Sequence, residues 1–311
     1  MSGLVPHIDP DGLLEYSVVY TDRAVNHMSE SFQNVMNDIS TTLCSVYSAD
    51  AVAVVPGSGT FGMEAVARQF AAGEHVLVIR NGWFSFRWTQ IFEAGDLPTS
   101  HTVCMARQVN NGHQSPFTPA PLEDVVRQIQ EEQPKVVFAP HVETSAGMIL
   151  PDEYLSAIAE AVHGVGGIFV LDCIASGAIW VNMKRCGVDV LISAPQKGWS
   201  GTPCSALVMM SERAIELLQV TTSSSFSCDL KKWRDIMASY EQGGHAYHAT
   251  MPTDGLRNFR DVMNETRNLG FAEIENAQRE LGIQVRDLLE SHGYPSVAAT
   301  GYEAPGVVVS Y

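Results

Sequence analysis

A glycine-rich turn in the first third of the sequence has the residues to hold an anion. Gly57, Ser58, Gly59 and Thr60 follow the β-branched run 51–55 and precede a segment with helical periodicity. Free backbone N–H groups and the helix dipole favour a negative charge at such a helix start. The turn lacks the Gly-Lys pair of a Walker A loop and the G-x-G-x-x-G pattern, which argues against nicotinamide binding. Glycine-rich turns also serve only to reverse the chain, so both interpretations stay open here.

Two further residues lie where an open sheet binds ligands. Asp172 ends the apolar run 167–171, and Lys197 follows the apolar run 188–194. The carboxyl ends of parallel strands form the ligand-binding edge of such a sheet. Asp172 could instead cap a following helix, and a single surface lysine indicates nothing by itself. Together with the glycine turn, however, these residues indicate one particular cofactor.

Pyridoxal 5'-phosphate makes three demands on a protein. Its phosphate needs N–H donors, its aldehyde needs a lysine to form a Schiff base, and its pyridine nitrogen needs a carboxylate that keeps the ring protonated. The turn 57–60, Lys197 and Asp172 meet these demands in that order. The sequence therefore predicts pyridoxal 5'-phosphate as the cofactor.

Six motifs stand in a fixed order along most of the chain. They are GSGT-x-x-x-E (57–64), NGWF (81–84), HVETSAG (141–147), the strand that ends in Leu171-Asp172, SAPQKGW (193–199) and YHATMP (247–252). In this order they resemble the class V, fold-type I, aminotransferases of the alanine-glyoxylate, serine-pyruvate and 2-aminoethylphosphonate group. The resemblance implies transfer of an amino group from a small amino acid or aminophosphonate to a keto acid such as glyoxylate or pyruvate.

The same resemblance implies a role for individual residues around the cofactor. The implied contacts are Ser58, Gly59 and Thr60 to the phosphate, with Gln196 beside it; Phe84 or, after a one-residue shift, Trp83 stacked on the pyridine ring; Thr144 or Ser145 to the ring hydroxyl; Asp172 to the ring nitrogen; Ile174 against the ring; and Lys197 as the Schiff-base residue. Trp83 and Phe84 could equally be core aromatics. His141, His245 and His248 are interpreted as loop histidines without a catalytic role.

The resemblance also implies an obligate homodimer with a shared active site. In this family the Tyr-His-x-Thr segment reaches into the neighbouring subunit, so Tyr247 and Thr250 are expected to complete the partner's phosphate site. Two departures leave the amino donor and acceptor open. The family's arginine for the substrate carboxylate has no counterpart up to Tyr311, and residues 7–17 replace the usual glycine-containing N-terminal loop.

The order of apolar segments predicts the scaffold that positions these residues. Apolar residues at three- and four-residue intervals predict a long amphipathic helix over residues 24–48. Short apolar runs then alternate with helix-length segments, the runs being 51–55, 75–80, 134–140, 167–173 and 188–194. This alternation is typical of a mostly parallel sheet covered on both faces. We therefore expect an α/β protein with a three-layer α/β/α large domain, which binds the cofactor, over residues 15–255.

The remainder of the chain predicts a smaller α+β domain. It comprises residues 256–311 with the N-terminal arm 1–14. A helical region is expected from Leu256 to His292, with an inward set of Phe259, Val262, Met263, Leu269, Phe271, Ile274, Leu281, Val285 and Leu288. The run 306–311 predicts a strand at which the chain stops, so this small domain is expected to be truncated.

Composition excludes several other classes of function. The chain has 311 residues, 45% hydrophobic and 17% charged, with a formal net charge of -16. This charge repels a phosphate backbone and argues against a nucleic-acid partner. Six widely spaced cysteines show neither a disulfide framework nor metal-ligand spacing. No window approaches the length of a membrane span. We expect a cytoplasmic protein without a metal site.

Two alternatives to a transaminase remain at this stage. A β-eliminating lyase or desulfurase uses the same scaffold, because reaction type depends on how the Cα bonds lie relative to the cofactor ring. A desulfurase needs a cysteine on a mobile loop, for which Cys228 beside the polar stretch 221–227 is the candidate. The other alternative is a catalytically inactive fragment or binding protein of the family, against which Asp172 and Lys197 argue.

Overall fold

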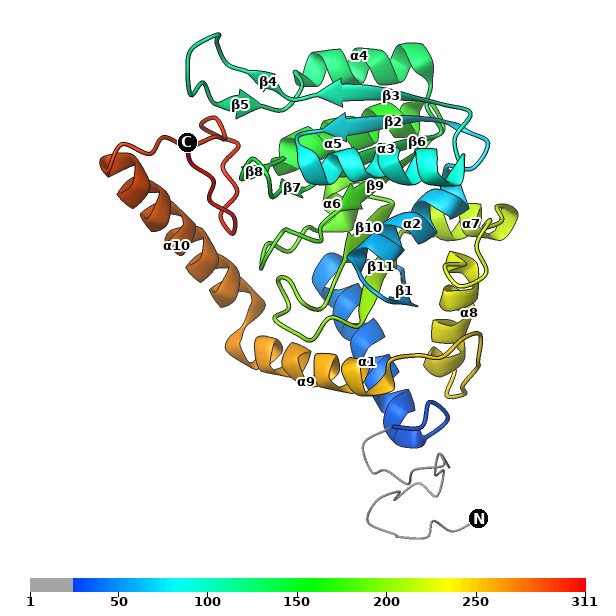
Figure 1. The fold of residues 1–311 in the computed structure, drawn as a ribbon. Helices are drawn as coiled ribbons and strands as arrows, with labels where there is room; N and C mark the ends of the chain where they lie inside the picture. Colours follow the sequence, from blue (N-terminus) through cyan, green and yellow to red (C-terminus); the bar gives the residue numbers. More distant parts are fainter. Residues whose placement is uncertain (1–24) are drawn as a thin grey trace, which may run out of the picture.

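A seven-stranded sheet lies at the centre of the computed structural model, which describes residues 25–311 (Figure 1). The predicted arm 1–14, the loop 7–17 and the start of the helix predicted at 24–48 lie outside the described residues. Across the sheet the strands are β1 (Ala51–Pro56), β11 (Ser205–Met210), β10 (Val190–Ser193), β9 (Ile168–Asp172), β6 (Val136–Pro140), β2 (His75–Arg80) and β3 (Ser100–Met105).

The sheet is mostly parallel. The five strands from β10 to β3 run parallel, while β11 is antiparallel to both β10 and β1. β1 therefore points the same way as the parallel strands. Every residue of β6 and β9 is buried, and successive side chains of a strand point to opposite faces, so both faces of the sheet are covered. The predicted α/β fold is confirmed.

Helices and short strand pairs connect the main strands. The connecting helices are α2 (Gly59–Phe70), α3 (Trp83–Gly95), α4 (Leu122–Glu132), α5 (Asp152–Gly164) and α6 (Met183–Cys186), while α7 (Glu212–Val220) and α8 (Leu230–Glu241) follow the last strand, β11. The short pairs are β4 (Arg107–Gln108) with β5 (Phe117–Thr118), and β7 (Val142–Glu143) with β8 (Met148–Ile149). Across residues 25–311, no helix is both long and apolar enough to cross a membrane.

The long amphipathic helix predicted first is α1 (Glu30–Tyr47). It begins later than predicted because Ser29 caps it: the Ser29 hydroxyl accepts the Phe32 N–H at 3.1 Å. Its apolar face is buried, as the periodicity requires, and comprises Phe32, Val35, Met36, Ile39 and Leu43. Ser48, in the left-handed conformation with φ 56°, ends the helix and leads into β1.

The topology places the carboxyl ends of several strands at one edge. β1 ends at Pro56 before the glycine turn, β9 ends at Asp172, and β10 ends at Ser193 shortly before Lys197. Because β1, β9 and β10 point the same way, these chain segments leave the sheet together. The sequence-predicted cofactor residues therefore share one side of the sheet.

The predicted helical region 256–292 is two helices in the structure, α9 (Thr253–Leu269) and α10 (Phe271–Ser291). Gly270 separates the two helices. Its φ of 95° lies in a region that strains any residue with a Cβ. α9 lies against α1, and α10 extends away from it (Figure 1). The domain boundary at residue 255 stays a prediction, since α9 packs on the large domain.

Two predictions for this region are wrong. Phe259 and Met263 are buried as predicted, but four members of the inward set are exposed, namely Leu269, Leu281, Val285 and Leu288. Periodicity shows that a helix has an apolar face and not whether another element covers it. The run 306–311 is not a strand: it forms an isolated bridge between Ser310 and Ser296, next to a hydrogen bond from Val297 N–H to Val309 O of 3.0 Å.

Candidate active site

A pocket of about 210 Å³ opens at the edge where β1, β9 and β10 end. Its walls come from segments far apart in the sequence and are formed by Ser58, Gly59, Thr60, Phe84, Arg87, Val142, Thr144, Asp172, Ile174, Ala175, Gln196 and Lys197. Nine of these twelve were predicted as cofactor contacts from the sequence; Arg87, Val142 and Ala175 were not. The structure thus brings most of the predicted site together.

The glycine turn offers the pocket an uncapped helix start. α2 begins at Gly59, and Ser58 before it makes no side-chain capping bond to the first turn. The first N–H groups of a helix have no partner within the helix, so an anion here would satisfy them. A Cβ on Gly59 would lie 2.5 Å from Ile174 Cδ1, which shows how closely the turn approaches the opposite wall. The turn therefore has the chemistry of an anion site.

Asp172 is a buried carboxyl group in the wall of the pocket. It is 8% exposed, and its Oδ1 accepts the Ile174 N–H at 2.9 Å. The pKa of Asp172 is raised to about 6, mainly by burial and to a lesser extent by the charge of Glu143, while the hydrogen bond from the Ile174 N–H and the charges of Arg87 and Lys197 oppose the rise. It does not cap a helix, because turns follow it and α6 begins only at Met183. Asp172 is therefore poised to pair with a cation.

Lys197 lies on a tight loop that its neighbours hold in place. Gly201 N–H donates to Pro195 O at 2.7 Å, closing the loop, and Lys197 is exposed toward the pocket. Trp199 is buried among the aromatic rings of Tyr47, Trp180, Phe259 and Phe271. The lysine thus projects from a rigidly anchored loop.

Two glycines bring the Asp172 and Lys197 loops into backbone contact. A Cβ on Gly198 would lie 1.9 Å from the carbonyl oxygen of Gly177. Gly177 itself has φ 65°, and its Cβ would lie 2.5 Å from Oε1 of Gln278 on α10. Glycine at both positions therefore permits the approach that sets the spacing between the acid and the lysine.

The structure separates the two paired alternatives in the sequence. Phe84 lines the pocket, whereas Trp83 is 64% exposed and lines a different hollow with Phe86 and Met105. Thr144 lines the pocket, whereas the Ser145 hydroxyl is engaged elsewhere: it donates to Glu143 Oε1 at 2.6 Å and accepts the Trp83 N–H at 2.9 Å. Trp83 and Ser145 are therefore not in the pocket wall.

Glu143 is a residue that sequence reasoning missed. It is fully buried, and its carboxylate accepts five hydrogen bonds, from the N–H groups of Phe84, Ser85 and Ser145 and from the hydroxyls of Ser85 and Ser145. Three of these donors belong to the first turn of α3, where a negative charge is stabilised. Glu143 thereby ties the segment that carries Phe84 to the segment that carries Thr144. Its place in the HVETSAG motif was the available signal.

A family model described as "Aminotransferase class-V" matches residues 13–308. The chain belongs to the class V aminotransferase family. A soluble hydrogenase small subunit of Synechococcus sp. is 27% identical over 91% of this chain and 71% of its own length. A 2-aminoethylphosphonate–pyruvate transaminase of Syntrophobacter fumaroxidans is 30% identical over 79% of this chain and 64% of its own length.

The solved structures agree on the fold. The ureidoglycine–glyoxylate aminotransferase of Bacillus subtilis superposes with a TM-score of 0.79, covering 92% of this chain and 71% of that protein at 23% identity. This class V aminotransferase therefore has the predicted architecture, a mostly parallel sheet with helices on both faces, in common with solved aminotransferases.

Class V aminotransferases depend on pyridoxal 5'-phosphate, and the pocket fits that group. The uncapped start of α2 suits a phosphate, and buried Asp172 suits a protonated ring nitrogen. The side-chain oxygen of Gln196 is buried without a partner among the described residues, and a bound group would supply one. The wall of the pocket also contains Phe84, whose aromatic ring is a surface for the cofactor ring. These residues would hold the cofactor in this class V aminotransferase.

Tyr247 and Thr250 lie in another hollow of this class V aminotransferase. Tyr247 is 63% exposed, and its hydroxyl is 3.4 Å from that of Thr250. His27 and His248 line the same hollow, and the His27 and Tyr247 rings are 5.5 Å apart. Neither Tyr247 nor Thr250 contributes to the pocket of its own chain. The prediction that they serve a partner subunit stays open.

The cysteine predicted for a desulfurase is not in this pocket. Cys228 is 6% exposed and packs in the hydrophobic core, and burial raises the pKa of its thiol. A nucleophilic cysteine needs the opposite, an exposed thiol with a lowered pKa. The pocket wall contains no cysteine among the described residues. The structure therefore does not support the desulfurase alternative for this class V aminotransferase.

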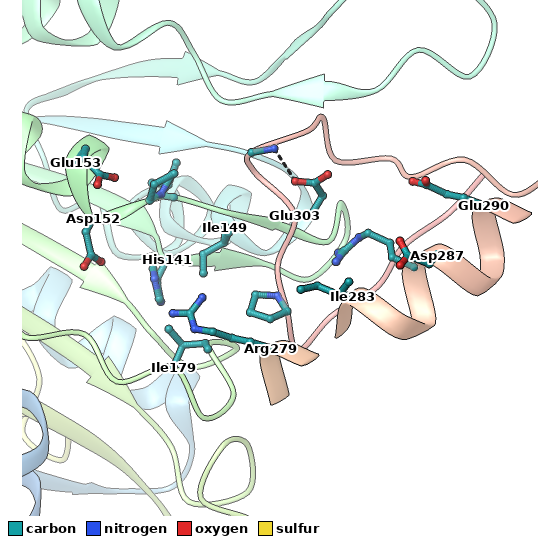
Figure 2. A pocket seen from close by; sticks show the side chains of 15 residues that line it. His141, Ile149, Asp152, Glu153, Ile179, Arg279, Ile283, Asp287, Glu290 and Glu303 are labelled. Carbon is teal, nitrogen blue, oxygen red and sulfur yellow. Dashed lines mark hydrogen bonds between the residues drawn. The ribbon is translucent and has the colours of Figure 1, made fainter. Parts of the chain in front are cut away.

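A larger cavity of about 620 Å³ lies between α5, α10 and the segment 301–305 (Figure 2). His141 forms part of its wall, is 2% exposed and lies 2.7 Å from the Ser176 hydroxyl through Nδ1. Burial, with the nearby charge of Arg279, lowers the pKa of His141 to about 4, so the ring is neutral at pH 7. No residue predicted to contact the cofactor lines this cavity.

Proposed function

We propose that this class V aminotransferase moves an amino group from a small amino acid or aminophosphonate to a keto acid such as glyoxylate or pyruvate. One observation carries the proposal: a buried acid and a lysine from adjacent strands face one pocket that also contains an uncapped helix start. The transaminase name of the relative from Syntrophobacter fumaroxidans supports an aminophosphonate donor and a pyruvate acceptor.

Each residue of the pocket has a proposed task. When bound, the cofactor supplies an electron-withdrawing ring that stabilises negative charge at the substrate Cα. Asp172 keeps a proton on the ring nitrogen, and Phe84 stacks on the ring while Ile174 packs against it. Lys197 Nζ would hold the cofactor at its aldehyde carbon and, once a substrate amine has taken that place, would act as the base that accepts and gives back the substrate Cα proton.

The remaining contacts position the cofactor. Ser58, Gly59 and Thr60 hold the phosphate through the first turn of α2, with Gln196 beside it. Thr144 is proposed to donate its hydroxyl to the ring hydroxyl, since the Ser145 hydroxyl already bonds Glu143. These contacts come from three separate segments, namely the start of α2, the loop after β7 and the loop after β10.

A half-reaction experiment tests this function. Mixing the cofactor-loaded protein with one amino donor and no keto acid should change the visible absorbance once and yield one carbonyl product, a keto acid or an aldehyde, per site. Adding glyoxylate or pyruvate should restore the spectrum, because a transaminase alternates between two forms of its cofactor. Continuous release of ammonia without an acceptor would instead indicate a lyase, and no spectral change with any donor would indicate an inactive protein. A panel of amino acids and aminophosphonates identifies the donor.

We also propose a cytoplasmic homodimer in which each phosphate is bound by both chains. Tyr247 and Thr250 lie on an irregular, exposed segment that a second subunit could cover. The six cysteines are all unpaired in the structure, which supports a reducing compartment.

Subunit mixing tests the shared site. A Lys197→Ala protein and a Tyr247→Phe, Thr250→Ala protein should each be impaired alone. After exchange, heterodimers should contain one site with both defects and one with neither, so partial activity should return. Exchange without recovery, or a monomer in sedimentation with full cofactor occupancy, would contradict a shared site. Mixing either variant with itself is the control.

A further inference from the structure

Arg87 contributes a positive charge to the wall of the cofactor pocket. It lies on α3, three residues after Phe84, and is half-buried. Within residues 25–311, its guanidinium forms no ion pair with an Asp or Glu, although its charge acts on the carboxyl group of Asp172 in the same wall. Arg87 and Lys197 are the cations among the residues that form the pocket wall. Since the lysine is proposed to bond the aldehyde, the charge of Arg87 has no assigned task.

The contacts of Arg87 direct this charge toward the start of α2. One guanidinium nitrogen donates to Oγ1 of Thr60 at 3.2 Å. Its central carbon lies 5.2 Å from the centroid of the Phe84 ring, within the range of a cation–π contact. Arg87 therefore joins the residue proposed to stack on the ring with a residue proposed to hold the phosphate.

The charge of a phosphate monoester requires more than the helix start provides. Such a group carries a charge of about -1.5 to -2 near neutral pH, whereas a helix N-terminus is equivalent to about half a positive charge. The protein as a whole carries -16. A guanidinium suits the missing charge, because it can donate two parallel hydrogen bonds to phosphate oxygens.

We propose that Arg87 is the cation of the phosphate site and makes this pocket select phosphorylated over unphosphorylated pyridoxal. The inference rests on the proposed cofactor site. In this arrangement Thr60 orients the guanidinium, and the start of α2 supplies the remaining donors. The Phe84 contact keeps the guanidinium from swinging into solvent.

Two ligands that differ only in the phosphate test the proposal. Pyridoxal 5'-phosphate and pyridoxal are titrated separately into the cofactor-free wild type, Arg87→Gln and Arg87→Lys, with visible absorbance as the readout. Arg87→Gln should weaken pyridoxal 5'-phosphate by about 10- to 100-fold, the usual effect of losing a charged hydrogen bond. Binding of pyridoxal should not change. The affinity of Arg87→Lys for pyridoxal 5'-phosphate should lie between those of the wild type and Arg87→Gln, because lysine keeps the positive charge but cannot donate two parallel hydrogen bonds. Arg127→Gln, an exposed arginine paired with Asp124 at 2.6 Å, is the control.

Each outcome decides the proposal. Equal weakening of both ligands would overturn it, because Arg87 would then act through the Phe84 ring or the fold. Unchanged binding of both ligands would overturn it as well. If Arg87→Gln does not fold, inorganic phosphate decides: it should compete with pyridoxal 5'-phosphate in the wild type and less in Arg87→Lys. Failure of the wild type to bind either ligand would instead show that the proposed cofactor site itself is wrong.

Discussion

Replacement of Lys197 by alanine is expected to abolish covalent attachment of the cofactor. It should also lower turnover by about 10²- to 10⁴-fold or more, since 10²- to 10⁴-fold is the usual contribution of one positioned proton-transfer group. The side chain projects into the pocket from a loop that Trp199 anchors, so its removal should leave the fold intact. Borohydride reduction of the wild type, followed by peptide mapping, should place the pyridoxyl label on Lys197. The same treatment of Lys197→Ala should give no label.

Lys184→Ala is the matched control for this experiment. Lys184 is exposed on α6, pairs with Asp50 at 2.7 Å and does not line the cofactor pocket. It should keep both label and turnover. A label on Lys135 or Lys184 in the wild type, or near-normal turnover of Lys197→Ala, would show that another lysine carries the chemistry.

Asp172→Asn should bind the cofactor and still lose most of the rate of Cα proton removal, by orders of magnitude. A neutral amide accepts the Ile174 N–H as the carboxylate does, but it cannot keep the ring nitrogen protonated, so the electron sink weakens. Single-turnover absorbance with one amino donor measures that rate directly. Near-normal turnover would refute the role of Asp172.

Asp172→Asn should slow the reaction of the cofactor-loaded protein, but it should stabilise the cofactor-free protein against unfolding. The pKa of Asp172 rises from 3.8 to about 6 on folding, so folding favours its protonated form. The stability this group contributes is therefore present below about pH 4 and lost as pH rises through 6. Asp172→Asn removes that loss. The free energy of unfolding of Asp172→Asn minus that of wild type should therefore increase by up to about 3 kcal/mol between pH 4 and pH 7. Denaturant unfolding at both pH values measures this difference.

Asp124→Asn provides the contrast. Hydrogen bonds from Arg127 and Arg107 lower the pKa of the half-buried Asp124, so its contribution to stability is present above its unfolded pKa and lost on acidification. Its replacement should not stabilise the protein at pH 7. If Asp172→Asn also fails to stabilise the cofactor-free protein at pH 7, the carboxyl group is not the buried, protonation-sensitive group described here.

The sequence was most informative where one local signal decided the structure. Apolar β-branched runs predicted β1, β2, β6, β9 and β10, because strands buried on both faces need apolar residues at every position. The sequence predicted less where the exposure of an element depends on which other elements pack against it. β3, at the sheet edge, is exposed or half-buried at every position except Cys104, and the apolar face of α10 is left uncovered among the described residues. Neither outcome can be derived from periodicity within one segment.

The residues of the candidate site also fall into those that the sequence could predict and those that it could not. Asp172 and Lys197 follow strand ends, so their common edge could be predicted from topology. Glu143 could not, because its five donors come from two segments that only the folded chain brings together. Arg87 was within reach of the sequence, since residues three apart on a helix share a face, and Phe84 was already assigned to the cofactor.

The contact between Gly177 and Gly198 restricts how this active site can change by single mutations. Any side chain at Gly198 would strike the backbone of the other loop, and any at Gly177 would meet both backbone strain and Gln278. A productive change at either position thus needs several simultaneous substitutions, which single-step evolution rarely supplies. Engineering of donor preference should therefore leave both glycines fixed and vary the pocket wall, starting with Val142 and Ala175, which line the pocket and are not part of the contact between the glycines.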